Sequence, residues 1–97
     1  MTYYVDIDNT ICSTTGSNYQ DSTPIFHRIL RINELFNNGH NIFYWTARGN
    51  RSNQDHHDLT IRQLDLWGCL RHGLIMNKPS FDLLIDDKAI DSEAFFI

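Results

Sequence analysis

The sequence predicts an α/β domain in which helices cover both faces of a parallel sheet of about four strands, as in Rossmann-like folds. Two observations lead to this expectation. Apolar runs of strand length alternate with segments of helical periodicity, which implies parallel pairing through crossover helices. The 97 residues also suffice for one compact core but not for two. We therefore expect residues 1–97 to form a single three-layer α/β/α domain.

The first half of the chain predicts two strands and one helix. Residues 2–7 are rich in aromatic and β-branched side chains and run directly into polar residues, which is typical of a strand. Thr23 and Pro24 are typical of a helix cap followed by a first-turn proline. Apolar residues then recur at intervals of three and four over residues 25–36, which indicates one buried helix face. Residues 41–46 form the second predicted strand.

The second half predicts a helix, two short strands and a terminal helix. Residues 59–67 show a looser helical pattern, ended by a glycine. Residues 74–76 are expected to form the third strand. Residues 81–85 contain the unbroken run Leu-Leu-Ile, which predicts a fourth strand buried on both faces. A short last helix is expected from Asp91.

The composition is that of an ordinary globular protein, with 41% hydrophobic and 21% charged residues. A formal net charge of −4 with scattered Lys and Arg argues against a nucleic-acid binder, which needs a basic stripe. Met1 is followed by neither a signal-peptide pattern nor an apolar run of about 18 residues. We therefore expect a cytoplasmic protein with no nucleic-acid or membrane partner. Cys12 and Cys69 are expected to be free thiols.

Polar residues follow each predicted strand, at the sheet edge where open parallel sheets bind their ligands. They are Asp6, Asp8, Thr10, Thr46, Arg48, Lys78, Asp86 and Asp87. Any one of them has an ordinary structural explanation, but four carboxylates at one edge repel each other and call for a cation. Oxygen ligands without nearby His or Cys favour Mg²⁺. The candidate metal ligands are Asp6, the backbone carbonyl of Asp8, and Asp86 or Asp87.

These side chains suit phosphoryl transfer. Asp6 and Asp8 are one residue apart, so near the end of a strand their side chains are expected to lean toward the same side. Asp6, held against the metal, is the predicted nucleophile, and the less directly held Asp8 is the predicted general acid and base. Arg48 could grip a second anionic group or lie on the surface. The candidate phosphate or substrate contacts are Thr10, Thr46, Arg48 and Lys78, and Lys78 also has a catalytic role.

The segment Asp6-Ile7-Asp8-Asn9-Thr10, followed in order by Thr46, Lys78 and the Asp86-Asp87 pair, resembles the four motifs of the haloacid dehalogenase superfamily of phosphatases. The resemblance covers nearly the whole chain and implies the same roles: nucleophile, general acid/base, phosphate contacts and magnesium ligation. Residues 44–49 and 83–90 look like short members of that superfamily associated with bacterial capsule and surface-sugar biosynthesis.

Most members of that superfamily carry a cap domain, and here the corresponding spaces hold only short polar loops. The resemblance therefore implies an open site, which favours a bulky substrate or shielding by a second subunit or partner. A homo-oligomer is one way to provide that shielding.

The sequence thus predicts a magnesium-dependent phosphatase that acts on a phosphorylated small molecule, such as a sugar phosphate or nucleotide, through an aspartyl phosphate. One alternative is a non-catalytic binding or scaffold module that has kept the fold. Another is a receiver-like phospho-acceptor domain, although a receiver begins with an acidic pair whereas this chain ends with one. A nuclease or sugar transferase could also display an Asp-x-Asp motif, but neither requires the distant Thr and Lys.

Overall fold

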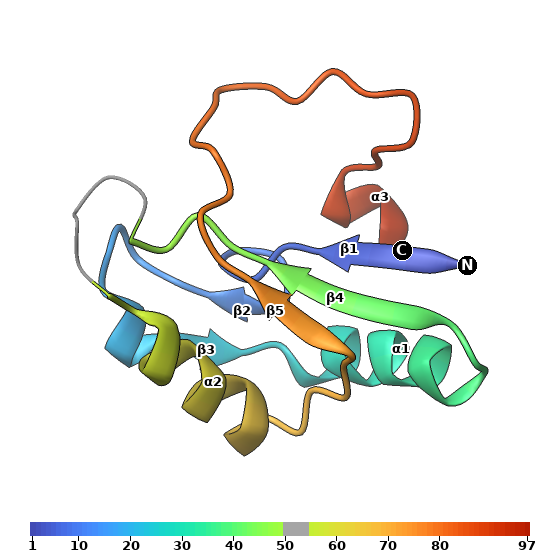
Figure 1. The fold of residues 1–97 in the computed structure, drawn as a ribbon, viewed down its shortest axis with the longest axis horizontal. Coiled ribbons are helices and arrows are strands. Elements are labelled where there is room, and N and C mark those ends of the chain that lie inside the picture. Colours follow the sequence, from blue (N-terminus) through green and yellow to red (C-terminus); the bar gives the residue numbers. More distant parts are fainter. Residues whose placement is uncertain (50–54) are drawn as a thin grey trace.

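The main sheet consists of three parallel strands. The computed structural model describes residues 1–49 and 55–97. The strands lie in the order β1 (Thr2–Val5), β4 (Asn41–Trp45) and β5 (Gly73–Ile75) (Figure 1). Both pairings are parallel, as predicted, but the sheet has three strands where about four were expected.

A small second sheet precedes the first long helix. Strands β2 (Cys12–Ser13) and β3 (Thr23–Pro24) pair in antiparallel fashion, and α1 (Phe26–Asn37) follows. The prediction that Thr23 and Pro24 begin this helix is wrong, because their backbone joins the small sheet. Proline is tolerated there since a strand at a sheet edge can do without one amide donor. No cap domain is evident in the part of the chain that the structure describes.

The two remaining helices lie close to where the sequence predicts them. Helix α2 (His57–Leu66) begins two residues before the predicted range 59–67. Gly68 ends it in the left-handed region at φ 73°, where glycine carries no steric penalty. Helix α3 (Ser92–Phe95) starts after Asp91, whose side chain accepts a backbone hydrogen bond as an N-cap. Among the described residues, no helix has the length and apolar character needed to traverse a bilayer.

The two longer helices pack on the same face of the sheet (Figure 1). Side chains alternate along β4, so Ile42 and Tyr44 are fully buried against the helices. Phe43 and Trp45 point to the other face and are only partly buried. There they contact the exposed Tyr4 ring of β1, with centroids 5.6 and 5.9 Å away. No described helix covers this aromatic face, so the predicted third layer is not seen in residues 1–49 and 55–97.

Side chains of the sheet, the helices and their connections form one core. Its buried apolar members are Val5, Ile7, Ile11, Cys12, Ile29, Ile32, Leu35, Ile42, Tyr44, Leu64, Trp67 and Cys69. Cys12 and Cys69 are both free and buried, which confirms the prediction of unpaired thiols. Burial in apolar surroundings raises the pKa of a thiol because the thiolate loses its hydration.

Ionisation of the buried Cys69 thiol is expected to destabilise the fold in alkaline solution. Burial raises the pKa of Cys69 from 9.0 to about 11, so the folded chain keeps a proton that the unfolded chain releases. The stabilisation is complete below pH 9 and is lost as pH rises toward 11. Between about pH 8 and 10, the free energy of unfolding in urea should fall by on the order of 1 kcal/mol through this group. Cys69→Ala should remove that part of the decline, and an unchanged decline in the variant would contradict this explanation.

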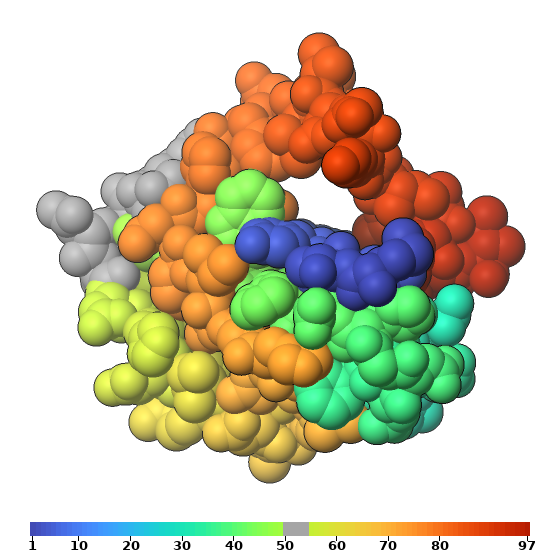
Figure 2. Space-filling view, turned by 45° about the vertical axis from the view of Figure 1, so that its right-hand side comes forward, coloured from blue at the N-terminus to red at the C-terminus, as the bar shows by residue number. Residues whose placement is uncertain are grey.

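The predicted fourth strand, residues 81–85, does not join the sheet. Leu83 is 76% exposed and Ile85 is 90% exposed, so the prediction that both faces of this segment are buried is wrong. Residues 79–90, which we call the arch, curve through solvent instead (Figure 1). A space-filling view shows an opening between the arch and β1 (Figure 2). An unbroken apolar run indicates burial but does not identify the surface that provides it.

The arch is fixed to the domain at both ends. At its start, the backbone amide of Lys78 donates to the carbonyl of Thr46 at 2.9 Å. Beyond its end, α3 is held by the ion pair between Arg28 and Glu93 at 2.9 Å. Strand β1 lies at the edge of the sheet, and its side away from β4 has no strand partner among the described residues. The arch and the edge of β1 are therefore two unpaired features that border the same opening (Figure 2).

Candidate functional site

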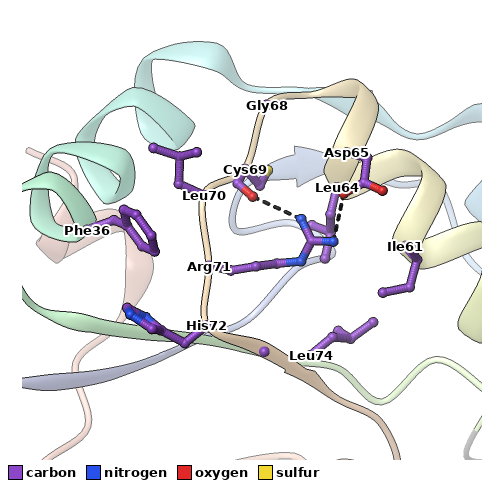
Figure 3. A pocket seen from close by; sticks show the side chains of 11 residues that line it. Phe36, Ile61, Leu64, Asp65, Gly68, Cys69, Leu70, Arg71, His72 and Leu74 are labelled. Carbon is purple, nitrogen blue, oxygen red and sulfur yellow. Dashed lines mark hydrogen bonds and ion pairs between the residues drawn. The ribbon is translucent and has the colours of Figure 1, made fainter.

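One hollow on the surface is a depression beside β5 (Figure 3). It has a volume of about 610 Å³ and is lined by apolar side chains, including Phe36 and Leu74. Its charged residues, Arg71 and Asp65, pair with each other at 2.8 Å, and Arg71 also donates to the carbonyl of Cys69. A hollow whose charges already satisfy each other offers little chemistry.

The second hollow is a cleft at the carboxyl ends of the strands, with a volume of about 620 Å³. Asp6 enters it after β1, Ala47 after β4, and Lys78 after β5. Asn9 and Phe81 also line the cleft. The sequence predicted convergence of polar residues at this edge, and the ends of the three strands do meet in this cleft. Open parallel sheets commonly bind ligands in such a crevice.

The loop after β1 sets the direction of the first acidic residues. The strand ends at Val5, and the amides of Thr10 and Ile11 both donate to the carbonyl of Ile7, at 3.1 and 3.0 Å. Asn9 takes a left-handed conformation at φ 61°, which asparagine adopts more readily than most residues. The chain is therefore turning, not extended, across the Asp-x-Asp motif.

Asp6 is held by a hydroxyl on one oxygen and approached by a cation on the other. The hydroxyl of Thr10 donates to Asp6 Oδ2 at 2.8 Å, and Lys78 Nζ lies 3.5 Å from Oδ1. Lys78 also lies over the rings of Trp45 and Phe81, 5.2 and 5.5 Å from their centroids. Because its side chain is only 15% exposed, the ammonium is confined close to Asp6. The predicted association of Asp6, Thr10 and Lys78 is present.

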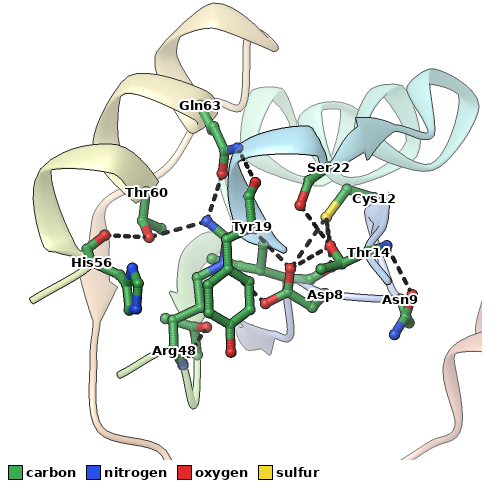
Figure 4. A network of polar contacts seen from close by, with 12 residues as sticks. Asp8, Asn9, Cys12, Thr14, Tyr19, Ser22, Arg48, His56, Thr60 and Gln63 are labelled. Carbon is green, nitrogen blue, oxygen red and sulfur yellow. Dashed lines mark hydrogen bonds and ion pairs between the residues drawn. The ribbon is translucent and has the colours of Figure 1, made fainter. Parts of the chain in front are cut away.

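The carboxylate of Asp8 faces Arg48 and Thr14 (Figure 4), whereas that of Asp6 contacts Thr10 and Lys78. Arg48 Nε donates to Asp8 Oδ2 at 2.9 Å, and Arg48 Nη2 donates to Oδ1 at 2.8 Å. The Thr14 hydroxyl also donates to Oδ1, at 2.6 Å. Asp8 is not among the residues that line the cleft, so the expectation that Asp6 and Asp8 face the same side is wrong. Within the protein, a two-bond arginine pair holds the Asp8 carboxylate.

Arg48 is an interior residue, only 1% exposed. The surface alternative for this residue is therefore wrong. The anionic group that its guanidinium grips is the carboxylate of Asp8. Its remaining nitrogen, Nη1, donates to Thr60 Oγ1 at 3.1 Å and to Gln63 Oε1 (Figure 4). A phosphate contact by Arg48 would have to replace one of these bonds.

The network continues from Arg48 to the segment that precedes α1. Gln63 Nε2 donates to the backbone carbonyl of Tyr19 at 2.6 Å, and the Tyr19 ring lies 4.8 Å from the Arg48 guanidinium carbon. Tyr19 belongs to the short 3₁₀ helix η1 (Tyr19–Asp21). Sequence reasoning missed Thr14, Tyr19, Thr60 and Gln63. The available signal was in α2, where Thr60 and Gln63 are polar residues next to Leu64 on the buried face.

Thr46 lies beneath the cleft and does not line it. The residue is 1% exposed, and its hydroxyl accepts a hydrogen bond from the backbone amide of Arg48 at 3.1 Å. Its carbonyl accepts from Lys78, so Thr46 joins the end of β4 to the start of the arch. The Thr46 hydroxyl therefore does not face the cleft, where a phosphate would have to lie for the predicted contact.

Asp86 and Asp87 are exposed residues of the arch and do not line the cleft. The backbone amide of Lys88 donates to Asp86 Oδ1 at 2.9 Å, which lowers the pKa of that carboxyl. Within the described residues, no three His, Cys, Asp or Glu side chains are arranged to hold a metal ion. The predicted gathering of the acidic pair with Asp6 is therefore not met within one chain.

Comparisons with known proteins support the fold and leave the activity open. No protein-family model matches the chain, and no curated protein matches it. A crystal structure of an MCSG target from Vibrio cholerae matches with a TM-score of 0.88 and 24% sequence identity. The match covers 98% of this chain and 86% of that chain. Similarity at this level of identity shows the fold alone.

Proposed function

We propose that this chain is a phosphatase of the haloacid dehalogenase type that hydrolyses a phosphorylated small molecule through an aspartyl phosphate. The observation that carries the proposal is the 3.5 Å approach of Lys78 Nζ to Asp6 Oδ1 on the wall of one cleft. A carboxylate beside a fixed cation is what phosphoryl transfer to an aspartate requires. The cleft volume of about 620 Å³ suits a ligand such as a sugar phosphate or a nucleotide.

Asp6 is the nucleophile in this proposal. The hydroxyl of Thr10 fixes one of its oxygens, and the side chain is 37% exposed toward the cleft. In the first step, an Asp6 oxygen forms a bond to phosphorus while the bond to the leaving oxygen breaks, and the leaving oxygen takes up a proton. In the second step, a water oxygen forms a bond to phosphorus while the bond from phosphorus to the Asp6 oxygen breaks; the water gives up a proton to solvent, and inorganic phosphate and the Asp6 carboxylate are released.

Lys78 is the residue that holds the phosphoryl group. Negative charge spreads over the equatorial oxygens during transfer, and a cation fixed in place beforehand stabilises that charge without reorganisation. The contacts of Lys78 with Trp45 and Phe81 provide such fixation. The ammonium also offsets the repulsion between the Asp6 carboxylate and an incoming phosphate.

Asp8 serves as general acid and base only if it first releases a partner. Both of its oxygens accept hydrogen bonds from Arg48, and one also accepts from Thr14. Proton transfer to the leaving oxygen, typically worth about 10²–10⁴-fold, therefore needs one of these bonds to open. In the arrangement described above, Asp8 is a positioning residue that fixes the loop carrying Asp6.

Magnesium is the proposed cofactor, on the chemistry of the available donors. The carboxylate of Asp6, the carbonyl of Asp8 and the Asp86-Asp87 pair are hard oxygen ligands. One chain does not bring them together, because the acidic pair lies on the arch. The roles given to Asp6 and Lys78 do not depend on the position of the ion. Two unpaired thiols fit a reducing compartment, which supports a cytoplasmic location.

A non-catalytic binding module is the second candidate. Two observations favour it: the acidic pair lies away from the cleft, and both oxygens of Asp8 are engaged in the interior. Such a module would bind a phosphorylated ligand at Lys78 without turning it over. A receiver-like domain would instead retain a phosphoryl group on Asp6.

Phosphate release from a generic aryl phosphate separates the three functions. A phosphatase gives repeated turnover with Mg²⁺ that is lost on chelation with EDTA. A receiver-like domain gives at most one equivalent of phosphoryl group retained on the protein, and a binding module gives neither. Release no faster than the protein-free blank, with Mg²⁺ present and across the neutral pH range, would rule out the phosphatase.

A further inference from the structure

The arch exposes the side chains that a fourth strand would bury. Leu83, Leu84 and Ile85 are all exposed, and so is Ile90 at its end. Across the opening lies β1 (Figure 2), whose side away from β4 has no strand partner in the described part of the chain. Tyr4 of β1 is also exposed. Soluble chains seldom leave both an apolar strand-forming segment and a free sheet edge without a partner.

Parallel alignment of the arch with β1 would give the edge of β1 a strand partner and would bury Leu83 and Ile85. If Asp86 lay beside Asp6, Leu83 would lie beside Tyr3, and Ile85 beside Val5. Tyr3 and Val5 face the core, so the side chains of Leu83 and Ile85, which would lie beside them, would be covered by the core as well. Leu84 would lie beside Tyr4 on the aromatic face. The alternation of the arch thus matches the alternation of β1.

The chain cannot easily place its own arch in that register. Lys78 is fixed to Thr46 at the carboxyl end of β4, and only four residue steps separate it from Asp82, which would lie beside Thr2. Four steps reach at most about 14 Å. Thr2 pairs with Asn41, five residue steps before Thr46, so the required path is about 17 Å along the strands and about 10 Å across two strand spacings, or about 19 Å in all. The anchor that brings Lys78 to Asp6 therefore opposes closure within one chain.

We propose that two copies of this chain exchange arches. Residues 81–85 of each copy extend the sheet of the other copy at β1, and the Asp86-Asp87 pair of each copy completes the site at the other copy's Asp6. The second copy is the fitting partner because each chain carries both the free edge and the strand that matches it. A mutual exchange of this kind closes with two-fold symmetry. The catalytic part of this inference rests on the proposed phosphatase function, whereas the assembly does not.

The assembly is tested by mass in solution. The protein should run at twice the chain mass of 11.4 kDa in size-exclusion chromatography with light scattering. Leu83→Asp should give a folded monomer, because it places a charge where the exchanged strand meets the other copy's core. Leu66→Asp is the matched control: Leu66 is 82% exposed on α2, and this variant should remain a dimer. A monomeric parent protein, or a Leu83→Asp variant that stays dimeric, would overturn the exchange.

The shared site is tested by mixing two inactive variants. Asp6→Asn keeps its acidic pair, and the double variant Asp86→Asn/Asp87→Asn keeps its Asp6. When the two are unfolded together and refolded at equal amounts, half of the dimers are mixed and each mixed dimer has one intact site. About one quarter of the parent phosphatase activity should return.

The two proposals fail in different ways. An active parent protein whose mixed variants recover no activity would show that each chain completes its own site, which overturns the exchange and leaves the phosphatase standing. If the parent protein is dimeric but inactive and the Leu83→Asp variant is monomeric, the phosphatase proposal is overturned and the exchanged assembly is supported.

Discussion

The Asp6→Asn variant is expected to lose aryl phosphate hydrolysis by on the order of 10⁴-fold or more, because an amide cannot form the phosphoryl intermediate. The loss should fall on kcat, since Lys78 remains in the cleft to bind the phosphate. The replacement has nearly the same shape, and its oxygen can still accept the hydrogen bond from Thr10. The fold should therefore be unchanged. Phosphate release under saturating substrate is the measurement.

Asp58→Asn is the matched control for this experiment. It makes the same chemical change at a carboxylate whose side chain is 94% exposed, at the start of α2. It should retain the parent rate within about twofold, as expected for a surface substitution away from the site. Hydrolysis by Asp6→Asn at a rate comparable to that of Asp58→Asn would remove Asp6 from the mechanism.

The sequence predicts well those elements whose signal is local. Residues 2–5 and 41–45 form strands because short runs of aromatic and β-branched residues favour a pleated surface whatever lies around them. Gly68 and Asp91 mark helix ends through their own backbone and side-chain preferences. The N-terminus of α1 was predicted wrongly, because the cap pattern at Thr23 is equally compatible with a short strand once β2 is present to pair with it.

The structure differs from the sequence predictions where a residue's surroundings depend on parts of the chain far away in sequence. The apolar run at residues 81–85 correctly signals a segment suited to burial, but periodicity does not say which surface buries it. The same difficulty applies to Asp8 and Arg48, which lie 40 positions apart. Charge at a strand end suggests a ligand, whereas here the two residues neutralise each other inside the protein.

The pairing of Asp8 with Arg48 fixes the loop that carries the candidate nucleophile, Asp6, to the rest of the domain. Arg48 joins that loop to α2 through Thr60 and Gln63, and Gln63 continues to Tyr19. All three guanidinium nitrogens of Arg48 have hydrogen-bond partners in this network, so removal of Arg48 leaves Asp8, Thr60 and Gln63 each with one partner fewer. The network should therefore fail cooperatively.

Replacement of Arg48 by methionine is expected to destabilise the protein by about 3–5 kcal/mol, the typical cost of leaving one member of a buried ion pair without its partner. Such a loss is a large fraction of the roughly 5–15 kcal/mol that stabilises an ordinary domain. Arg48 is 1% exposed, and its side chain is 0% exposed in the pair with Asp8, so solvent cannot take over its hydrogen bonds. Urea denaturation followed by circular dichroism measures the change.

Two comparisons separate the charge pair from simple loss of packing. Arg31→Met removes an arginine whose side chain is 48% exposed and pairs with Glu34 at 3.4 Å, and it should cost no more than about 0.5 kcal/mol. Adding Asp8→Asn to Arg48→Met removes the orphaned carboxylate, so the double variant should lose about 1–3 kcal/mol less than the sum of the single losses. If Arg48→Met were as stable as Arg31→Met, Arg48 would not be holding the loop. If the two losses simply added, Asp8 and Arg48 would be acting independently, and Asp8 would be free for proton transfer without first releasing Arg48.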